Sequence, residues 1–173
     1  MHKKEKTSCS LLKVLARGRV WLWTVLFLLV GMATAEAWTG YVLYVLDGDS
    51  MLVQKEGARV EIRLYGIDAP EYNQPYGSAA GRFARTEVQG KKVTVIPVDT
   101  DRYGRTVAWV RCGGRLLNQE LVQHGYAWVY TRYCLDKKEC GQLKKLERAA
   151  KRAGRGLWKK KNPLPPWRWK TRS

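Results

Sequence analysis

Residues 60–65 alternate between aliphatic side chains and polar or aromatic ones, a period of two that is typical of a β-strand with one buried face. Val60, Ile62 and Leu64 share one face of this strand, and Arg63 lies on the opposite face. Other short extended patterns, bounded by turns that contain glycine or aspartate, lie at residues 40–46, 50–55, 93–95 and 106–110. Short strands joined by glycine turns in a chain of this size favour a closed five-stranded barrel.

Three segments have the spacing of helices rather than strands. Apolar residues recur at helical spacing in residues 79–88, at Ala79, Ala80, Phe83, Ala84 and Val88. Residues 116–124 suit a short helix that ends at Gly125. Residues 137–153 suit a longer helix; its inward-facing residues are expected to be Leu143, Leu146, Ala150 and Ala153. The predicted fold class is therefore α+β: a five-stranded, OB-fold-like β-barrel with about three packed helices.

The N-terminal segment has the layout of a secretory signal peptide. Six basic side chains precede an apolar run at residues 20–30, which is followed by small residues. The run is too short to cross a bilayer easily, and cleavage is expected after Ala37, with a second possible site after Ala35. The alternative is an uncleaved anchor helix. We therefore expect residues 1–37 to be a leader, and the rest to be exported to the periplasm or secreted, with a mature form that is not embedded in the membrane.

The 173-residue chain carries a net charge of +17, and most of this excess lies outside the leader. Such a charge favours a densely anionic partner, either nucleic acid or an anionic membrane surface. In an exported chain the close cysteines Cys134 and Cys140 are expected to form a disulfide, which leaves Cys112 in a predicted strand. The alternative is three free thiols.

The basic tail, residues 159–173, contains three prolines and two tryptophans, at Pro163, Pro165, Pro166, Trp167 and Trp169. It is expected to be too rich in proline for a helix, and either to lie extended along the domain or to stay mobile.

Carboxylates at predicted turns and strand ends suit an oxygen-ligated cation such as calcium or magnesium. These residues are Asp47, Asp49, Asp68 and Glu71. Taken singly, each also has a plain structural explanation as a turn residue or strand terminator. Nearby arginines strengthen the chemical interpretation, because planar guanidinium groups beside paired carboxylates suit a phosphodiester substrate.

Three ordered motifs closely resemble those of the staphylococcal nuclease (thermonuclease) family. They are Asp47-Gly48-Asp49-Ser50, then Arg63-Leu64-Tyr65-Gly66-Ile67-Asp68-Ala69-Pro70-Glu71, then Asp101-Arg102-Tyr103-Gly104-Arg105. The resemblance continues through Leu117-Asn118-Gln119-Glu120 to Gly156-Leu157-Trp158 and covers roughly residues 39–158. It implies a nuclease-like barrel domain at residues 38–158, between the leader and the basic tail.

The resemblance also implies roles for individual residues. Asp49, Asp68 and the backbone carbonyl of Ala69 match the family's calcium ligands, although the family often has threonine at the position of Ala69. Glu71 matches the general base or water-orienting carboxylate. Arg63 and Arg105 match the two arginines that grip the scissile phosphate. Tyr103 matches an aromatic residue near the nucleotide, and Tyr133 is expected to be a second nucleic-acid-binding aromatic residue. Tyr130 and Tyr133 both fall in a region where the disulfide loop departs from the type member.

These roles imply a monomeric, calcium-dependent endonuclease that hydrolyses DNA and RNA with little sequence preference and leaves 3′-phosphate ends. Single strands are expected to be preferred, since they fit a basic groove with stacking aromatic rings. No stable protein partner is expected. The alternatives are a catalytically idle nucleic-acid-binding module on the same barrel, and a cationic envelope-binding protein whose tail docks on anionic lipid or glycan.

Overall fold

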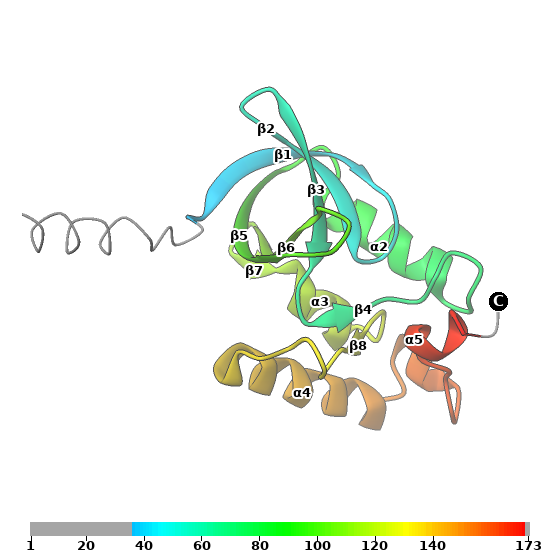
Figure 1. The fold of residues 1–173 in the computed structure, drawn as a ribbon. Helices are drawn as coiled ribbons and strands as arrows, with labels where there is room; N and C mark the ends of the chain where they lie inside the picture. The colour runs from blue at the N-terminus through cyan, green and yellow to red at the C-terminus, as the bar shows by residue number, and fades with distance from the viewer. Residues whose placement is uncertain (1–35, 172–173) are drawn as a thin grey trace, which may run out of the picture. The chain divides into compact units, whose positions relative to one another are not determined.

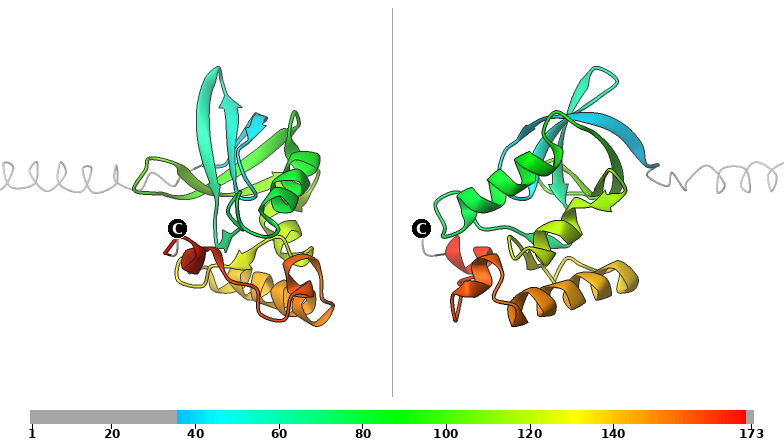
Figure 2. Two further views of the ribbon diagram at one scale, coloured as in Figure 1. Left: turned by 90° about the vertical axis from the view of Figure 1, so that its right-hand side faces the viewer. Right: turned by 180° about the vertical axis from the view of Figure 1, so that it is seen from behind.

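The computed structural model describes residues 36–171, and its ribbon is drawn in Figures 1 and 2. The strands are β1 (Trp38–Val45), β2 (Ser50–Lys55), β3 (Ala58–Leu64), β4 (Ile67–Asp68), β5 (Lys92–Thr100), β6 (Thr106–Cys112), β7 (Arg115–Leu116) and β8 (Trp128–Val129). The helices are α2 (Gly77–Val88), α3 (Leu117–Gln123), α4 (Lys137–Arg152), the 3-10 helix η1 (Gly156–Lys159) and α5 (Pro166–Trp169).

Five strands close into a barrel, as the sequence predicts. The antiparallel pairs run in the order β3-β2-β1-β5-β6, and a parallel pairing between β3 and β6 joins the two ends. In that closing pair Ile62 lies opposite Thr106 and Arg63 lies opposite Val107. Closure leaves no free edge between these strands and fixes the start of β6 beside the end of β3.

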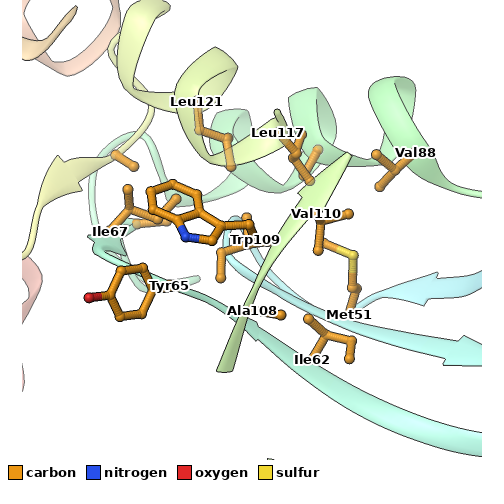
Figure 3. Packing of buried hydrophobic residues seen from close by; sticks show 14 of the residues in the cluster. Met51, Ile62, Tyr65, Ile67, Val88, Ala108, Trp109, Val110, Leu117 and Leu121 are labelled. Atoms are coloured by element: carbon orange, nitrogen blue, oxygen red, sulfur yellow. The ribbon is translucent and has the colours of Figure 1, made fainter. Parts of the chain in front are cut away.

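The alternation predicted for β3 is confirmed. Ile62 and Leu64 are fully buried inside the barrel, whereas Arg63 is partly exposed on the other face. Figure 3 shows Met51 and Val110 packed in the same interior. Because the side-chain period of a strand is two, the same register that buries the aliphatic residues also fixes which way Arg63 points.

A second part of the core lies between the barrel and the helices. Leu117 and Leu121 of α3 are buried there, and the rings of Tyr65 and Trp109 meet edge to face with centroids 5.2 Å apart. The fully buried Asn118 links this layer to the barrel: its amide donates to the carbonyl of Tyr65 at 3.0 Å and its oxygen accepts from the amide of Val110 at 3.1 Å. A buried polar side chain that is satisfied in this way ties separate elements together.

The three predicted helices are present with bounds close to those expected. In α2 the buried side chains are Ala80, Ala84 and Val88, at the spacing of one helical face. In α4 Leu143 and Ala150 are buried, but the prediction that Ala153 faces inward is wrong. Ala153 is exposed because the helix ends there, and Ala153 is its C-cap.

The basic tail is not wholly extended or unstructured, so the prediction that it contains no helix is wrong. Residues 166–169 form the short helix α5. Pro166 is compatible with it because it occupies the first turn, where a missing N–H breaks no helical hydrogen bond. In both views of the ribbon α5 lies beside the segment between β4 and α2 (Figures 1 and 2).

Cys134 and Cys140 form the predicted disulfide, with Cα atoms 5.7 Å apart, and Cys112 at the end of β6 is a free thiol. The predicted leader, apart from residues 36 and 37, lies outside the described residues. Within residues 36–171 no helix is both long and apolar enough to span a bilayer.

Candidate active site

Asp49 is held at the turn between β1 and β2. The side chain of Asp47 accepts a hydrogen bond from the Asp49 amide at 2.9 Å, which closes the turn. Gly48 lets this turn approach α2 closely, because a Cβ atom there would lie 2.6 Å from the Cβ of Ala69 and 2.8 Å from that of Ala80. The glycine of the Asp-Gly-Asp motif therefore allows the turn to pack closely against Ala69 and Ala80. This close packing places the Asp49 carboxylate against the segment that follows β4.

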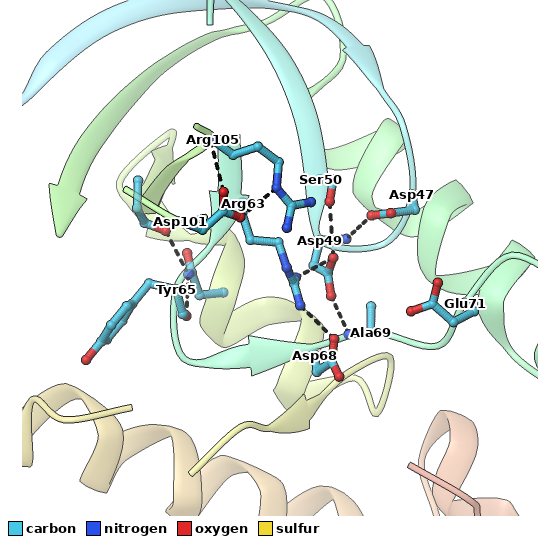
Figure 4. A network of polar contacts seen from close by, with 12 residues as sticks. Asp47, Asp49, Ser50, Arg63, Tyr65, Asp68, Ala69, Glu71, Asp101 and Arg105 are labelled. Carbon is cyan, nitrogen blue, oxygen red and sulfur yellow. Dashed lines mark hydrogen bonds and ion pairs between the residues drawn. The ribbon is translucent and has the colours of Figure 1, made fainter. Parts of the chain in front are cut away.

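Arg63 faces Asp49 because of the register between β2 and β3. Ser50, the residue after Asp49, lies opposite Arg63, and the amide of Leu64 donates to the carbonyl of Asp49 at 2.8 Å. As Figure 4 shows, the guanidinium of Arg63 lies between two carboxylates. One terminal nitrogen is paired with Asp49, and the other lies 2.6 Å from Oδ1 of Asp68.

Asp68 is positioned by the small second sheet. Strand β4 pairs with β8 so that Asp68 lies opposite Trp128, and Asp68 is 3% exposed. The amide of Ala69 donates to the second carboxylate oxygen of Asp49. Asp49, which is 5% exposed, is therefore tied to both the side chain of Arg63 and the backbone next to Asp68.

The electrostatics of this network favour protonation of its acids. Burial raises the pKa of Asp49 to about 7, against the opposing effect of the Arg63 guanidinium. Burial also raises the pKa of Asp68. Burial alone would lower the pKa of Arg63, but the charges of Asp49 and Asp68 outweigh it and raise that pKa.

Two buried carboxylates thus share a single guanidinium, so their ionised forms are not fully neutralised. A hard cation is the group that such an oxygen donor set would accept, and in this respect Asp49 and Asp68 fit a calcium ion. No cluster of three or more His, Cys, Asp or Glu arranged for a metal occurs in residues 36–171. The expected contribution of the Ala69 carbonyl stays a prediction; its amide is the group seen to bind Asp49.

Glu71 lies on a compact loop between β4 and α2. The Glu71 carbonyl accepts from the amide of Gln74 at 2.9 Å, and the carbonyl of Gln74 accepts from the amide of Gly77 at 2.9 Å. Tyr76, at φ 72°, has the left-handed backbone that lets the chain enter α2. Figure 4 shows Glu71 beside the network, with Ala69 between it and Arg63.

Arg105 enters the site from the turn before β6. It stands two residues before Val107, the register partner of Arg63 in the closing strand pair. Asp101 holds it in place: one carboxylate oxygen accepts from the Arg105 amide at 3.0 Å and the other from its Nε at 2.7 Å. In Figure 4 the free end of the Arg105 guanidinium is directed toward the network around Arg63. Barrel closure therefore brings the two predicted phosphate-binding arginines together.

The predicted nucleic-acid-binding aromatic residues are both exposed. Tyr103 is 69% exposed, with the guanidinium of Arg105 at 5.5 Å from its ring centroid. Tyr133 is 55% exposed and packs edge to face on Tyr130, with centroids 4.8 Å apart. Both rings are accessible to bases, and their role in binding stays a prediction.

Sequence reasoning missed two residues that contact Glu71. Gln74 is 5% exposed and accepts from the amide of Glu71 at 3.1 Å through its side-chain oxygen. Nζ of Lys170, in the tail, lies 2.8 Å from Oε1 of Glu71. The tail was expected to lie extended or to stay mobile, and no local sequence pattern indicates that Lys170 reaches Glu71.

Comparisons with known proteins identify the family of this chain. The family model described as "Staphylococcal nuclease homologue" matches residues 61–160, a range that includes Arg63, Asp68, Glu71 and Arg105. An "Uncharacterized endonuclease" of Escherichia coli O157:H7 is 42% identical over 134 residues, which cover 77% of this chain and 85% of the relative.

Two further relatives carry nuclease names. A "Micrococcal nuclease" of Shigella flexneri is 34% identical over 154 residues, covering 82% of this chain and 87% of that protein. A staphylococcal-like nuclease of Arabidopsis thaliana is 36% identical over 132 residues, covering 76% of this chain but 38% of the plant protein. The similarity to the bacterial relatives thus extends over most of both chains.

Proposed function

Because this chain belongs to the family of staphylococcal nuclease homologues, which hydrolyse phosphodiester bonds, we propose that it is a calcium-dependent endonuclease acting on DNA and RNA. The observation that supports this most strongly is the meeting of three separate segments at one site. The β2 turn supplies Asp49, the segment from β3 to the loop after β4 supplies Arg63, Asp68 and Glu71, and the turn before β6 supplies Arg105.

In the proposed reaction, Glu71 accepts a proton from the attacking water as its oxygen bonds to phosphorus, a role typically worth about 10²–10⁴-fold in rate. The bond from phosphorus to the 5′ oxygen breaks, that oxygen takes up a proton from solvent and leaves as a hydroxyl, and the 3′-phosphate end remains. Arg63 and Arg105 donate hydrogen bonds to the phosphate oxygens as negative charge grows on them.

Arg63 can do this while it stays fixed. A guanidinium has five N–H groups, so pairing with Asp49 and Asp68 leaves further donors for a phosphate. Calcium held by Asp49, Asp68 and the Ala69 carbonyl would supply positive charge for a phosphate oxygen and would favour ionisation of a nearby water. We also propose that the protein is exported, acts as a monomer, and prefers single strands, with Tyr103 and Tyr133 stacking on bases with little sequence preference.

The test is digestion of end-labelled single-stranded DNA and RNA with calcium or with EGTA. The wild type, Glu71→Gln and Arg105→Ala are compared, with Glu61→Gln on the exposed side of β3 as the matched control. Calcium-dependent products with 3′-phosphate ends are expected from the wild type and from the control only. Equal binding of the strands by all four proteins, with no cleavage by any, would replace this proposal with a binding module.

A further inference from the structure

Residues 164–170, here called the C-terminal strap, run alongside the loop that carries Glu71. The strap contains the short helix α5, and two views of the ribbon place α5 next to the segment between β4 and α2 (Figures 1 and 2). The sequence resemblance to the nuclease family ends near residue 158, before the strap begins. Apart from the contact of Lys170 with Glu71, none of the site roles assigned above therefore involves a strap residue.

Packing anchors the strap on the second sheet. The ring of Trp167 stacks on Tyr130, with centroids 5.0 Å apart and ring planes 1° from parallel. Tyr130 follows β8, and its amide donates to the carbonyl of Gly66 at 2.9 Å, directly before β4. Pro166 is buried. The strap is therefore seated on the same pair of strands that positions Asp68.

A buried amide connects the strap to the backbone of Glu71. Nε2 of Gln74 donates to the carbonyl of Leu164 at 2.6 Å, while Oε1 of the same side chain accepts from the amide of Glu71 at 3.1 Å. Gln74 is 5% exposed, so both ends of its amide group are satisfied away from solvent. The loop position of Glu71 and the path of the strap are thus linked through one side chain.

Two further contacts, both accessible to solvent, join the other end of the strap to the Glu71 loop. Nε1 of Trp169 donates to Oδ1 of Asn73 at 3.1 Å, and Nζ of Lys170 lies 2.8 Å from Oε1 of Glu71. Burial would lower the pKa of Lys170, but the hydrogen bond with Glu71 and the charge of Asp68 outweigh it and raise that pKa. Lys170 therefore keeps its positive charge and is within electrostatic reach of the buried acids.

The local charge explains why a basic strap settles here on a strongly basic protein. The chain has a net charge of +17, which would repel a positively charged segment from most of its surface. Around Glu71, however, the carboxylates of Asp49 and Asp68 share only the guanidinium of Arg63. The strap thus supplies a cation where the site has an excess of acid.

We propose that the C-terminal strap is part of the active site, with Gln74 and Lys170 as positioning residues for Glu71. Gln74 fixes the backbone of Glu71 through its contact with Leu164, and Lys170 fixes the carboxylate. This inference rests on the proposed role of Glu71 in hydrolysis. A catalytic carboxylate held at both points reaches its working geometry more often than one on a free loop, and a displacement of about 1 Å can cost on the order of 10²-fold in rate.

The decisive variants change Lys170 and a matched neighbour. Lys170→Met removes the charge that pairs with Glu71, and Lys170→Arg keeps it. Arg168→Met removes one positive charge from α5, two residues before Lys170, and leaves the pair intact. With single-stranded DNA and calcium, Lys170→Met is expected to lower kcat about tenfold or more with little change in KM. Lys170→Arg is expected to recover most of that loss, and Arg168→Met is expected to affect KM only.

A second readout does not depend on activity. Hydrogen–deuterium exchange of residues 71–76, measured in EGTA, is expected to speed up in Lys170→Met and in Gln74→Met, but not in Arg168→Met. Equal thermal midpoints would exclude global unfolding as the cause. The positioning role is overturned if Lys170→Met matches Arg168→Met in both measurements, or if Lys170→Met raises kcat. If the wild type cuts no nucleic acid while hydrogen–deuterium exchange of residues 71–76 changes as expected in the variants, the proposed nuclease function fails. In that case the conclusion that the strap holds the Glu71 loop in place stands.

Discussion

The backbone of Gly77 runs so close to the carbonyl oxygen of Glu71 that a Cβ atom at position 77 has no room. The neighbouring atoms are backbone atoms of the Glu71 loop, which cannot turn away as a flexible side chain would. The entry of α2 and the position of the candidate base are therefore coupled through a single missing methyl group.

Gly77→Ala is accordingly expected to move the Glu71 loop and to lower kcat on single-stranded DNA by about tenfold or more. Steady-state kinetics together with thermal unfolding measure the effect. Gly81→Ala is the matched control in the same helix, because a Cβ there would make only ordinary contact with Arg85. That control is expected to be neutral or to stabilise the fold by up to about 1 kcal/mol. Equal kcat values for the two variants would contradict the coupling.

Arg63→Met is expected to destabilise the protein by about 3–5 kcal/mol at pH 8, since it leaves two buried carboxylates without their shared cation. Urea denaturation measures the free energy of unfolding. Arg115→Met is the comparison: Arg115 pairs with Glu87 and Glu120, but its side chain is 61% exposed, so a loss below about 1 kcal/mol is expected. A loss for Arg63→Met no larger than that for Arg115→Met would show that the buried network contributes little to folding.

The pH dependence of the metal-free protein follows from Asp49. Its pKa is about 7 in the folded protein against an ordinary value of 3.8, so between these values the folded state binds a proton that the unfolded state has lost. This group's contribution to the free energy of unfolding is therefore full at low pH and is lost as the pH rises through about 7. Urea denaturation in EGTA across this range should show the decline, and Asp49→Asn should reduce it to the part that comes from the raised pKa of Asp68.

Calcium affinity should change in the opposite direction, because the metal needs ionised carboxylates. Isothermal titration with calcium is expected to show affinity rising by roughly tenfold per pH unit below the pKa of Asp49, then levelling off. An affinity independent of pH between 5.5 and 7.5 would indicate that Asp49 does not bind the ion.

Arg105→Ala is expected to lower kcat by about 10²-fold or more through loss of transition-state charge stabilisation. Asp101→Asn should have a smaller effect in the same direction, because it weakens the 2.7 Å contact that orients Arg105. Arg102→Ala, at the same turn, serves as the control, and single-turnover cleavage measures all three. If Arg102→Ala were as damaging as Arg105→Ala, the general charge of the turn would be responsible rather than the orientation of Arg105.

The sequence was sufficient for the features that depend on period and on local turns. The alternation around Arg63 predicts its face, the helical spacing of apolar residues in 79–88 predicts α2, and the close pair Cys134 and Cys140 predicts the disulfide; all are present. The barrel closure that brings Arg105 to Arg63 was predicted as a fold, although its register became visible only in the structure.

Contacts between segments that are distant in the chain could not be predicted from the sequence, because no local pattern specifies them. The pairing of Lys170 with Glu71 and the bridge from Gln74 to Leu164 depend on where the tail lands after the fold has formed. Proline density suggested that the tail has no helix, yet Pro166 at the first turn is compatible with one. The helical periodicity predicted that Ala153 faces inward, but periodicity does not reveal where a helix ends.

The position of the strap along the chain also sets an order of assembly. A ribosome delivers the barrel strands, the buried acids and both candidate phosphate-binding arginines well before residues 164–170 emerge. A growing chain can therefore build the hydrophobic core and still lack the contacts that steady Glu71. If the strap positions Glu71, the protein becomes able to hydrolyse its substrate only after the barrel has folded. That step is complete when Trp167 stacks on Tyr130 and Lys170 pairs with the carboxylate of Glu71.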